Sequence, residues 1–155
     1  MMNKNSGTFL DTSELPPAHY IFNEASANAF LTLQVEGYEA LGMLWNNLIT
    51  AAPEIREYRD LQIGIVSVSN VVVLVSMTDG SMILKMPLHQ DLDNVTVSPH
   101  GIWLIMETML LKINKVNFAV ASFVQLPDVI NSLRIDKNEI EIEGVTGEIF
   151  KIKDG

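Results

Sequence analysis

The residues best equipped for chemistry stand in one short segment, His89-Gln90-Asp91-Leu92-Asp93, which His100 follows. Imidazole and carboxylate groups ligate divalent metal ions, and a carboxylate can orient a histidine that acts as a general base. The spacing matches no metal motif, however, and Asp is also favoured in solvated turns. We expect a solvated loop. The alternative catalytic or metal-binding set of a small enzyme or ligand-binding domain is His89, Asp91, Asp93 and His100.

Other catalytic signatures are absent from the sequence. There is no Gly-x-Ser-x-Gly element, no glycine-rich phosphate loop and no cysteine. The lack of cysteine excludes disulfides, thiolate metal sites and a thiol nucleophile, and it fits a reducing compartment. We therefore assign no catalytic residue and expect no cofactor.

The charge of the chain is strongly acidic. Ten basic and 19 acidic side chains give a net charge of −9. Such a protein repels nucleic acid and anionic membranes and attracts basic surfaces. A row of acids near the C-terminus is a candidate docking face for a basic protein partner, or else a solvated strand face: Glu139, Glu141 and Glu143.

The elements that would position these groups begin with the apolar stretch Leu61–Leu88, in which only Asp79 and Lys85 are charged. It predicts three antiparallel strands at about 62–68, 71–77 and 82–86. A turn at Ser69-Asn70 sets Val66 opposite Val73. A two-residue type I′ turn at Asp79-Gly80 sets Val75 opposite Leu84.

Both faces of this predicted sheet are apolar. One face, with Val66 and Val73, is the expected core. The other is too apolar to leave in water, so a second copy, another part of the chain or a partner must cover it. From this face we take three further candidate partner-binding residues and a possible homodimer: Ile63, Ile65 and Leu74.

Helical periodicity appears on either side of these strands. Apolar residues at Leu31, Val35, Tyr38 and Trp45 predict a helix from about Glu24 to Pro53. Ser98-Pro99 reads as a helix start, and the apolar run beyond it predicts a central helix to about Asn114. A strand at about 116–124 and a short helix at 127–133 follow.

The chain closes with a hairpin whose register can be argued from charge. A three-residue turn at 145–147 sets Glu141 opposite Lys151 and Ile142 opposite Phe150, and it sets Glu139 opposite Lys153. Gly147 supplies the left-handed residue that such a loop needs.

The predicted fold class is therefore α+β: one domain with a mainly antiparallel sheet of about five to six strands and two principal helices. Residues 1–22 form an extended N-terminal arm, and residues 23–155 form the domain. Residues 1–5 are polar and show no secretory signal, and no uninterrupted apolar run would span a membrane, so we expect a cytoplasmic protein.

The first hypothesis for function is a small acidic protein without catalysis that masks a partner protein with a basic surface. Immunity proteins and secretion chaperones share this size and acidity, and the order helix, three strands, helix resembles the secretion-chaperone fold, although its C-terminal helix is missing. The enzyme or ligand-binding domain described above is the second hypothesis. A structural or assembly subunit that forms a homo-oligomer is the third.

Overall fold

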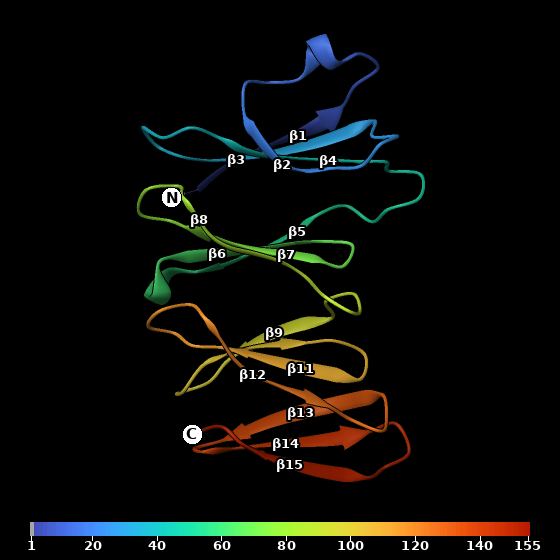
Figure 1. The fold of residues 1–155 in the computed structure, drawn as a ribbon, viewed down its shortest axis with the longest axis vertical. Helices are drawn as coiled ribbons and strands as arrows, with labels where there is room; N and C mark the ends of the chain where they lie inside the picture. The colour runs from blue at the N-terminus through green and yellow to red at the C-terminus, as the bar shows by residue number, and fades with distance from the viewer. Residues whose placement is uncertain (1) are drawn as a thin grey trace. The chain divides into compact units, whose positions relative to one another are not determined.

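The computed structural model describes residues 2–155, whose regular secondary structure is almost entirely β-strand (Figure 1). The chain divides into two compact units, Met1–Pro87 and Leu88–Gly155. The strands of the first unit are β1 (Met2–Thr8), β2 (His19–Asn23), β3 (Ala29–Val35), β4 (Leu41–Trp45), β5 (Glu54–Tyr58), β6 (Ile63–Val68), β7 (Val71–Ser76) and β8 (Met82–Pro87). Those of the second are β9 (Asn94–Val97), β10 (Ile102–Ile105), β11 (Met109–Ile113), β12 (Val120–Gln125), β13 (Ile130–Asp136), β14 (Glu139–Gly144) and β15 (Ile149–Lys153).

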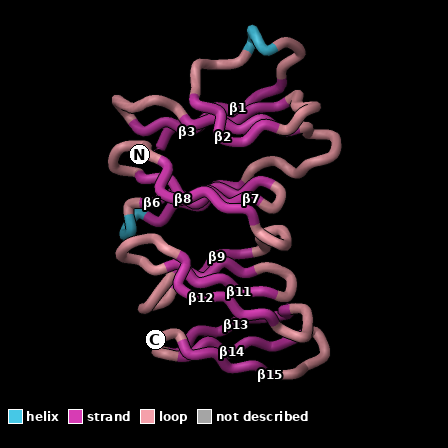
Figure 2. Tube along the Cα trace, in the orientation of Figure 1, coloured by secondary structure: helices cyan, strands magenta, loops and turns pink. Residues whose placement is uncertain are grey.

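The predicted α+β class with two principal helices is wrong, because the fold is all-β. The only helical segments within residues 2–155 are short 3₁₀ turns at Thr12–Glu14 and Arg59–Leu61 (Figure 2). The predicted helix from about Glu24 to Pro53 is instead β3 and β4. The predicted helix from Pro99 to Asn114 is β10 and β11, and the short helix expected at 127–133 is replaced by the start of β13.

Strand alternation explains the first of these corrections. Along β3, Leu31 and Leu33 point into the core, while Phe30 is partly exposed and Gln34 is exposed. This is a period of two, and the chain then turns at Gly37, whose φ of 84° favours glycine. The helical spacing in the sequence arose from joining the apolar positions of two strands across this turn.

The first unit contains two sheets. One has the order β1-β3-β4-β2, in which β2 runs parallel to β4, and the other is the antiparallel meander β5-β6-β7-β8. Their core holds Leu31 and Met43 from one sheet and Val66 and Val73 from the other. The predicted pairing of Val66 with Val73 is confirmed.

The hairpin between β7 and β8 differs from the prediction. The Asp79 carboxylate accepts hydrogen bonds from the N–H and hydroxyl of Ser81, at 3.0 and 2.7 Å, and only Gly80 of the predicted turn pair has positive φ. The Ser76 N–H donates to the Ser81 carbonyl at 2.8 Å, so residues 77–80 form the loop, which is wider than a type I′ turn, and a bulge lies before it between Leu74 and Val75. Leu84 faces Leu74 rather than Val75, so it lies on the opposite face from the one predicted.

The second unit also contains two sheets, β12-β11-β10-β9 and β13-β14-β15, and both are antiparallel meanders. Trp103 and Leu110 of the first pack in one core with Ile140 and Ile142 of the second. The terminal hairpin has the predicted register, including Glu141 opposite Lys151 and Ile142 opposite Phe150. Gly147 has the expected positive φ, at 86°.

Candidate functional site

The His89–Asp93 segment lies in the connection between β8 and β9. His89, Asp91 and Asp93 are exposed, whereas Gln90 exchanges hydrogen bonds with the side chain and backbone of Thr108, at 2.8 and 3.0 Å. The ring of His100 is hydrogen-bonded to Asn138 at 2.9 Å. Residues 2–155 contain no group of three or more His, Asp or Glu side chains placed to hold a metal ion.

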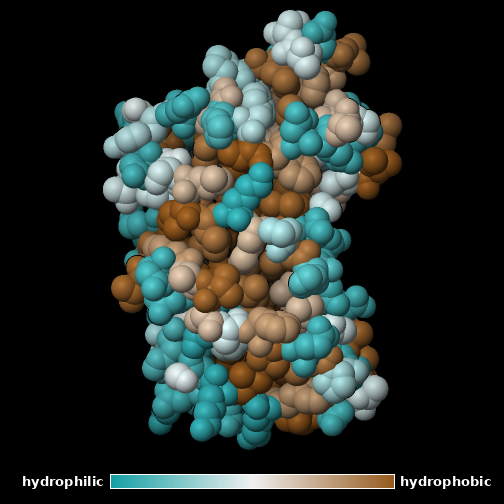
Figure 3. Space-filling model, in the orientation of Figure 1, coloured by the Kyte–Doolittle hydropathy of each residue, from teal (hydrophilic) through white to brown (hydrophobic). Residues whose placement is uncertain are grey.

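The acidic row Glu139, Glu141 and Glu143 lies on β14, where its members contact neighbouring strands. Lys151 lies 3.1 Å from Glu139 and 3.6 Å from Glu141, and Arg134 lies 3.1 Å from Glu141. The hydrogen bond to Glu139 and the charges of both acids raise the pKa of Lys151. In Figure 3 the part of the view that β13–β15 occupy shows hydrophilic side chains beside hydrophobic ones.

The apolar candidates are placed differently. Ile63, Ile65 and Leu74 are no more than 1% exposed in the single chain. The homodimer stays a prediction.

A buried carboxylate that sequence reasoning missed forms a network in the second unit. Asp154 is fully buried and accepts hydrogen bonds from the Ser98 hydroxyl and the Trp103 indole, both at 2.8 Å. The Lys112 ammonium lies 3.4 Å from the same oxygen and also donates to the Asp154 carbonyl. The other carboxylate oxygen has no hydrogen-bond partner among the described residues.

The pKa of Asp154 reflects opposing influences. Burial raises it, but the hydrogen bonds from Trp103 and Ser98 and the charge of Lys112 outweigh burial and hold it below the usual 3.8. The group is therefore an ionised anchor for the C-terminal residues. No sequence signal marks it, because an acid just beyond a strand, as Asp154 is beyond β15, is ordinarily solvated.

Strand β12 forms one edge of the sheet β12-β11-β10-β9. It contains no charged residue and no proline, and five of its six residues are exposed. Two large side chains are prominent: Val120 is 49% exposed and Phe123 is 59% exposed. A bare, uncharged edge of this kind is a template for pairing with another chain.

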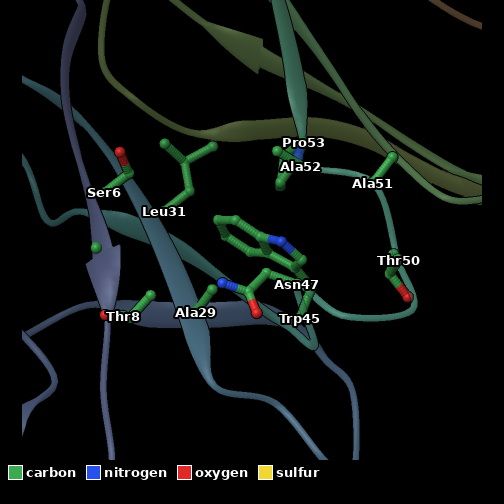
Figure 4. Close-up of a pocket in the computed structure, with 11 residues that line it drawn as sticks. Ser6, Thr8, Ala29, Leu31, Trp45, Asn47, Thr50, Ala51, Ala52 and Pro53 are labelled. Carbon is green, nitrogen blue, oxygen red and sulfur yellow. The ribbon is translucent and has the colours of Figure 1, made fainter.

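A cavity of about 430 Å³ lies within the first unit. Ala29, Leu31, Ala52 and Pro53 contribute apolar wall, while Ser6 and Asn47 contribute polar groups. Trp45 also lines it, and its indole N–H is buried without a hydrogen-bond partner among the described residues. Figure 4 shows the indole nitrogen on the edge of the ring that faces Ala52 and Pro53.

Comparison with known proteins identifies the fold and nothing finer. No family model and no curated protein matches the sequence. Among solved structures, a dihydro-heme d1 dehydrogenase, NirN, is 12% identical with a TM-score of 0.54, and the alignment covers 81% of this chain and 31% of that one. BamB from Moraxella catarrhalis is 12% identical with a TM-score of 0.52, covering 99% of this chain and 48% of that one.

The fold is β-propeller-like. The computationally designed protein Ika4 is also similar, at 9% identity and a TM-score of 0.50, with 92% of this chain and 95% of that one covered. The chain thus spans about a third of NirN and about half of BamB. At these identities the likeness extends to the arrangement of strands and not to any ligand. No comparison points to an immunity protein or a chaperone. No helix within residues 2–155 is long and apolar enough to cross a membrane.

Proposed function

We propose that this protein binds another protein, and that an extended segment of the partner adds to β12 as a further strand. The observation that carries the proposal is the exposed, uncharged edge of β12. In such complexes the backbone hydrogen bonds supply affinity, and side chains at alternate positions supply specificity. Val120 and Phe123 would contact apolar side chains of the added strand.

The other sheet edges support this choice because each has a feature that discourages pairing. Charged residues occur in β1, β5, β8, β13 and β15, and β8 also contains Pro87. Strand β9 has only four residues. The Lys85 ammonium donates to a backbone carbonyl of β2, that of Ile21. Charge, proline and shortness are the usual protections of sheet edges, and β12 has none of them.

The charge of the partner follows from the chain as a whole. A net charge of −9 favours a segment flanked by basic residues. We therefore expect a partner segment with apolar residues at alternate positions and Lys or Arg around them.

Selection of random displayed peptides against the purified protein tests the proposal. Selected peptides should show the alternating apolar pattern, and their binding should slow hydrogen exchange of the β12 amides. Val120→Lys should weaken binding by about tenfold or more, because the ammonium loses solvation when a strand covers it. Val116→Lys is the matched control, since Val116 lies just before β12 and is 90% exposed.

Three results would contradict the proposal. Peptides that protect other amides, or that bind both lysine variants equally, would place the interface elsewhere. A concentration-dependent dimer that Val120→Lys dissociates, observed by sedimentation without peptide, would assign the edge to a second copy of this chain.

A further inference from the structure

We propose that the cavity beside Trp45 is a binding site for a small, uncharged, largely apolar molecule that bears a hydrogen-bond acceptor. The site lies wholly within the first unit and is separate from β12. Its volume of about 430 Å³ falls in the range of small-ligand sites, about 300–1,000 Å³.

The indole of Trp45 indicates what the ligand must offer. The Trp45 side chain is 6% exposed, and its N–H donates to no acceptor among residues 2–155. Buried indole N–H groups usually find a partner, and the exceptions need an explanation. The nitrogen lies on the ring edge that faces Ala52 and Pro53 (Figure 4), but it has less than 1 Å² of exposed surface, so a ligand carbonyl reaches it only when this wall moves aside.

The walls indicate the charge of the ligand. None of the described residues that line the cavity has an ionisable side chain, and alanine, leucine and proline are among them. The nearby carboxylate of Glu24 is occupied, since its oxygens accept from the Thr50 hydroxyl at 3.0 Å and the Asn46 N–H at 2.9 Å. A charged ligand would lose its hydration without gaining a partner of opposite charge, which costs a large free energy. A neutral aromatic amide has no charge to desolvate, so its burial costs much less.

The two tryptophans of the chain provide the assay. In a nitrogen–proton correlation spectrum, Trp45 and Trp103 each give one indole signal, which Trp45→Phe and Trp103→Phe assign. Benzamide is the probe, because it combines an aromatic ring with a carbonyl acceptor. It should move the Trp45 signal downfield saturably, with a dissociation constant of about 0.1–1 mM, as expected for so small a ligand. The Trp103 signal should not move, because its N–H already donates to Asp154.

Matched probes and variants make the test specific. Benzoate has nearly the same shape but is anionic, and it should bind at least about tenfold more weakly. Ala52→Phe fills the cavity from an exposed loop and should weaken benzamide binding by about tenfold or more. Ala119→Phe, at an exposed position in the second unit, should leave the affinity within about twofold.

The proposal is overturned by any of three results: no saturable shift of the Trp45 signal at about 10 mM benzamide, equal binding of benzoate, or unchanged binding in the Ala52→Phe variant. If that variant loses its dispersed spectrum, Ala51→Phe takes its place. Shifts confined to the β12 amides would also refute this site, while leaving the strand-addition proposal intact.

Discussion

Removing the charge of Asp154 should destabilise the protein by an amount that depends on pH. The Asn side chain in Asp154→Asn keeps the shape and one acceptor oxygen, so the variant resembles the protonated acid. Hydrogen bonds to charged groups contribute about 1.5–3 kcal/mol, against about 0.5–1.5 for neutral ones. Two such bonds, from Ser98 and Trp103, weaken together, and Lys112 loses its counter-ion. We therefore expect a loss of about 2–3 kcal/mol near neutral pH.

Asp154→Ala should cost more, because it leaves the Trp103 indole without an acceptor and the Lys112 ammonium without its counter-ion, although the Ser98 hydroxyl can still donate to the Gly101 carbonyl. Breaking a buried charge pair by removing one partner costs about 3–5 kcal/mol. Asp136→Ala, at an exposed position of the same unit, is the control and should change stability by less than about 0.5 kcal/mol. Urea unfolding followed by Trp103 fluorescence in a Trp45→Phe background measures each difference.

The pH dependence gives the sharper test. The pKa of Asp154 is lowered in the folded protein, so the ionised carboxylate favours folding. Its contribution is complete above the unfolded value of 3.8 and is lost as the pH falls through the lower folded value. The difference in the free energy of unfolding between wild type and Asp154→Asn should be constant from about pH 7 to pH 5. It should shrink toward zero as the pH falls below 3.8. If this difference in the free energy of unfolding is absent at neutral pH, or persists unchanged in acid, the assigned role of the charge is refuted.

Two further predictions concern the terminal hairpin and the acidity of the chain. Gly147→Val should destabilise by about 1–2 kcal/mol in urea unfolding, because a β-branched residue resists positive φ, whereas Gly147→Asn should stay within about 0.5 kcal/mol. Equal costs for the two variants would show that backbone conformation is not the cause. For a basic peptide selected on β12, the association rate should fall by about tenfold as salt rises to about 0.5 M, with a smaller change in dissociation, since screening acts mainly on encounter. A flat association rate would limit the role of the charge to solubility.

The parts of the fold that the sequence predicts correctly are those in which polar and apolar residues alternate beside a defined turn. In the terminal hairpin, Ile140 and Ile142 can face the core only if Glu139 and Glu141 face outward, so one register satisfies both sets. The Val66–Val73 pair follows in the same way from a short turn. The Asp79-Gly80 hairpin differs from the prediction because Asp79 lacks the positive φ of a type I′ turn, and its carboxylate binds Ser81.

The two false helices have a common physical cause. β10 and β11 are almost entirely buried, so apolar residues occupy both faces and the period of two disappears. Such a run, joined to the next by a short polar turn at Glu107-Thr108, resembles a helix that is apolar all round. β4, which ends at Trp45, is also buried on both faces, so the sequence predicts it as helix. The predicted helix extends through residues 46–53, which complete the lining of the cavity, so the sequence does not predict the cavity either.

The proposed sites depend on sheet order, which local sequence does not encode. β7, Val71–Ser76, and β12, Val120–Gln125, are both six-residue uncharged strands rich in valine. β7 has a hydrogen-bonded strand on each side, and Val73 and Leu74 are fully buried; β12 has one neighbour, and Val120 and Phe123 are exposed. Similar residues thus serve as core in one sheet and as a free edge in another. The difference is set by which strand ends the meander, so a binding edge becomes recognisable only once the order of strands is known.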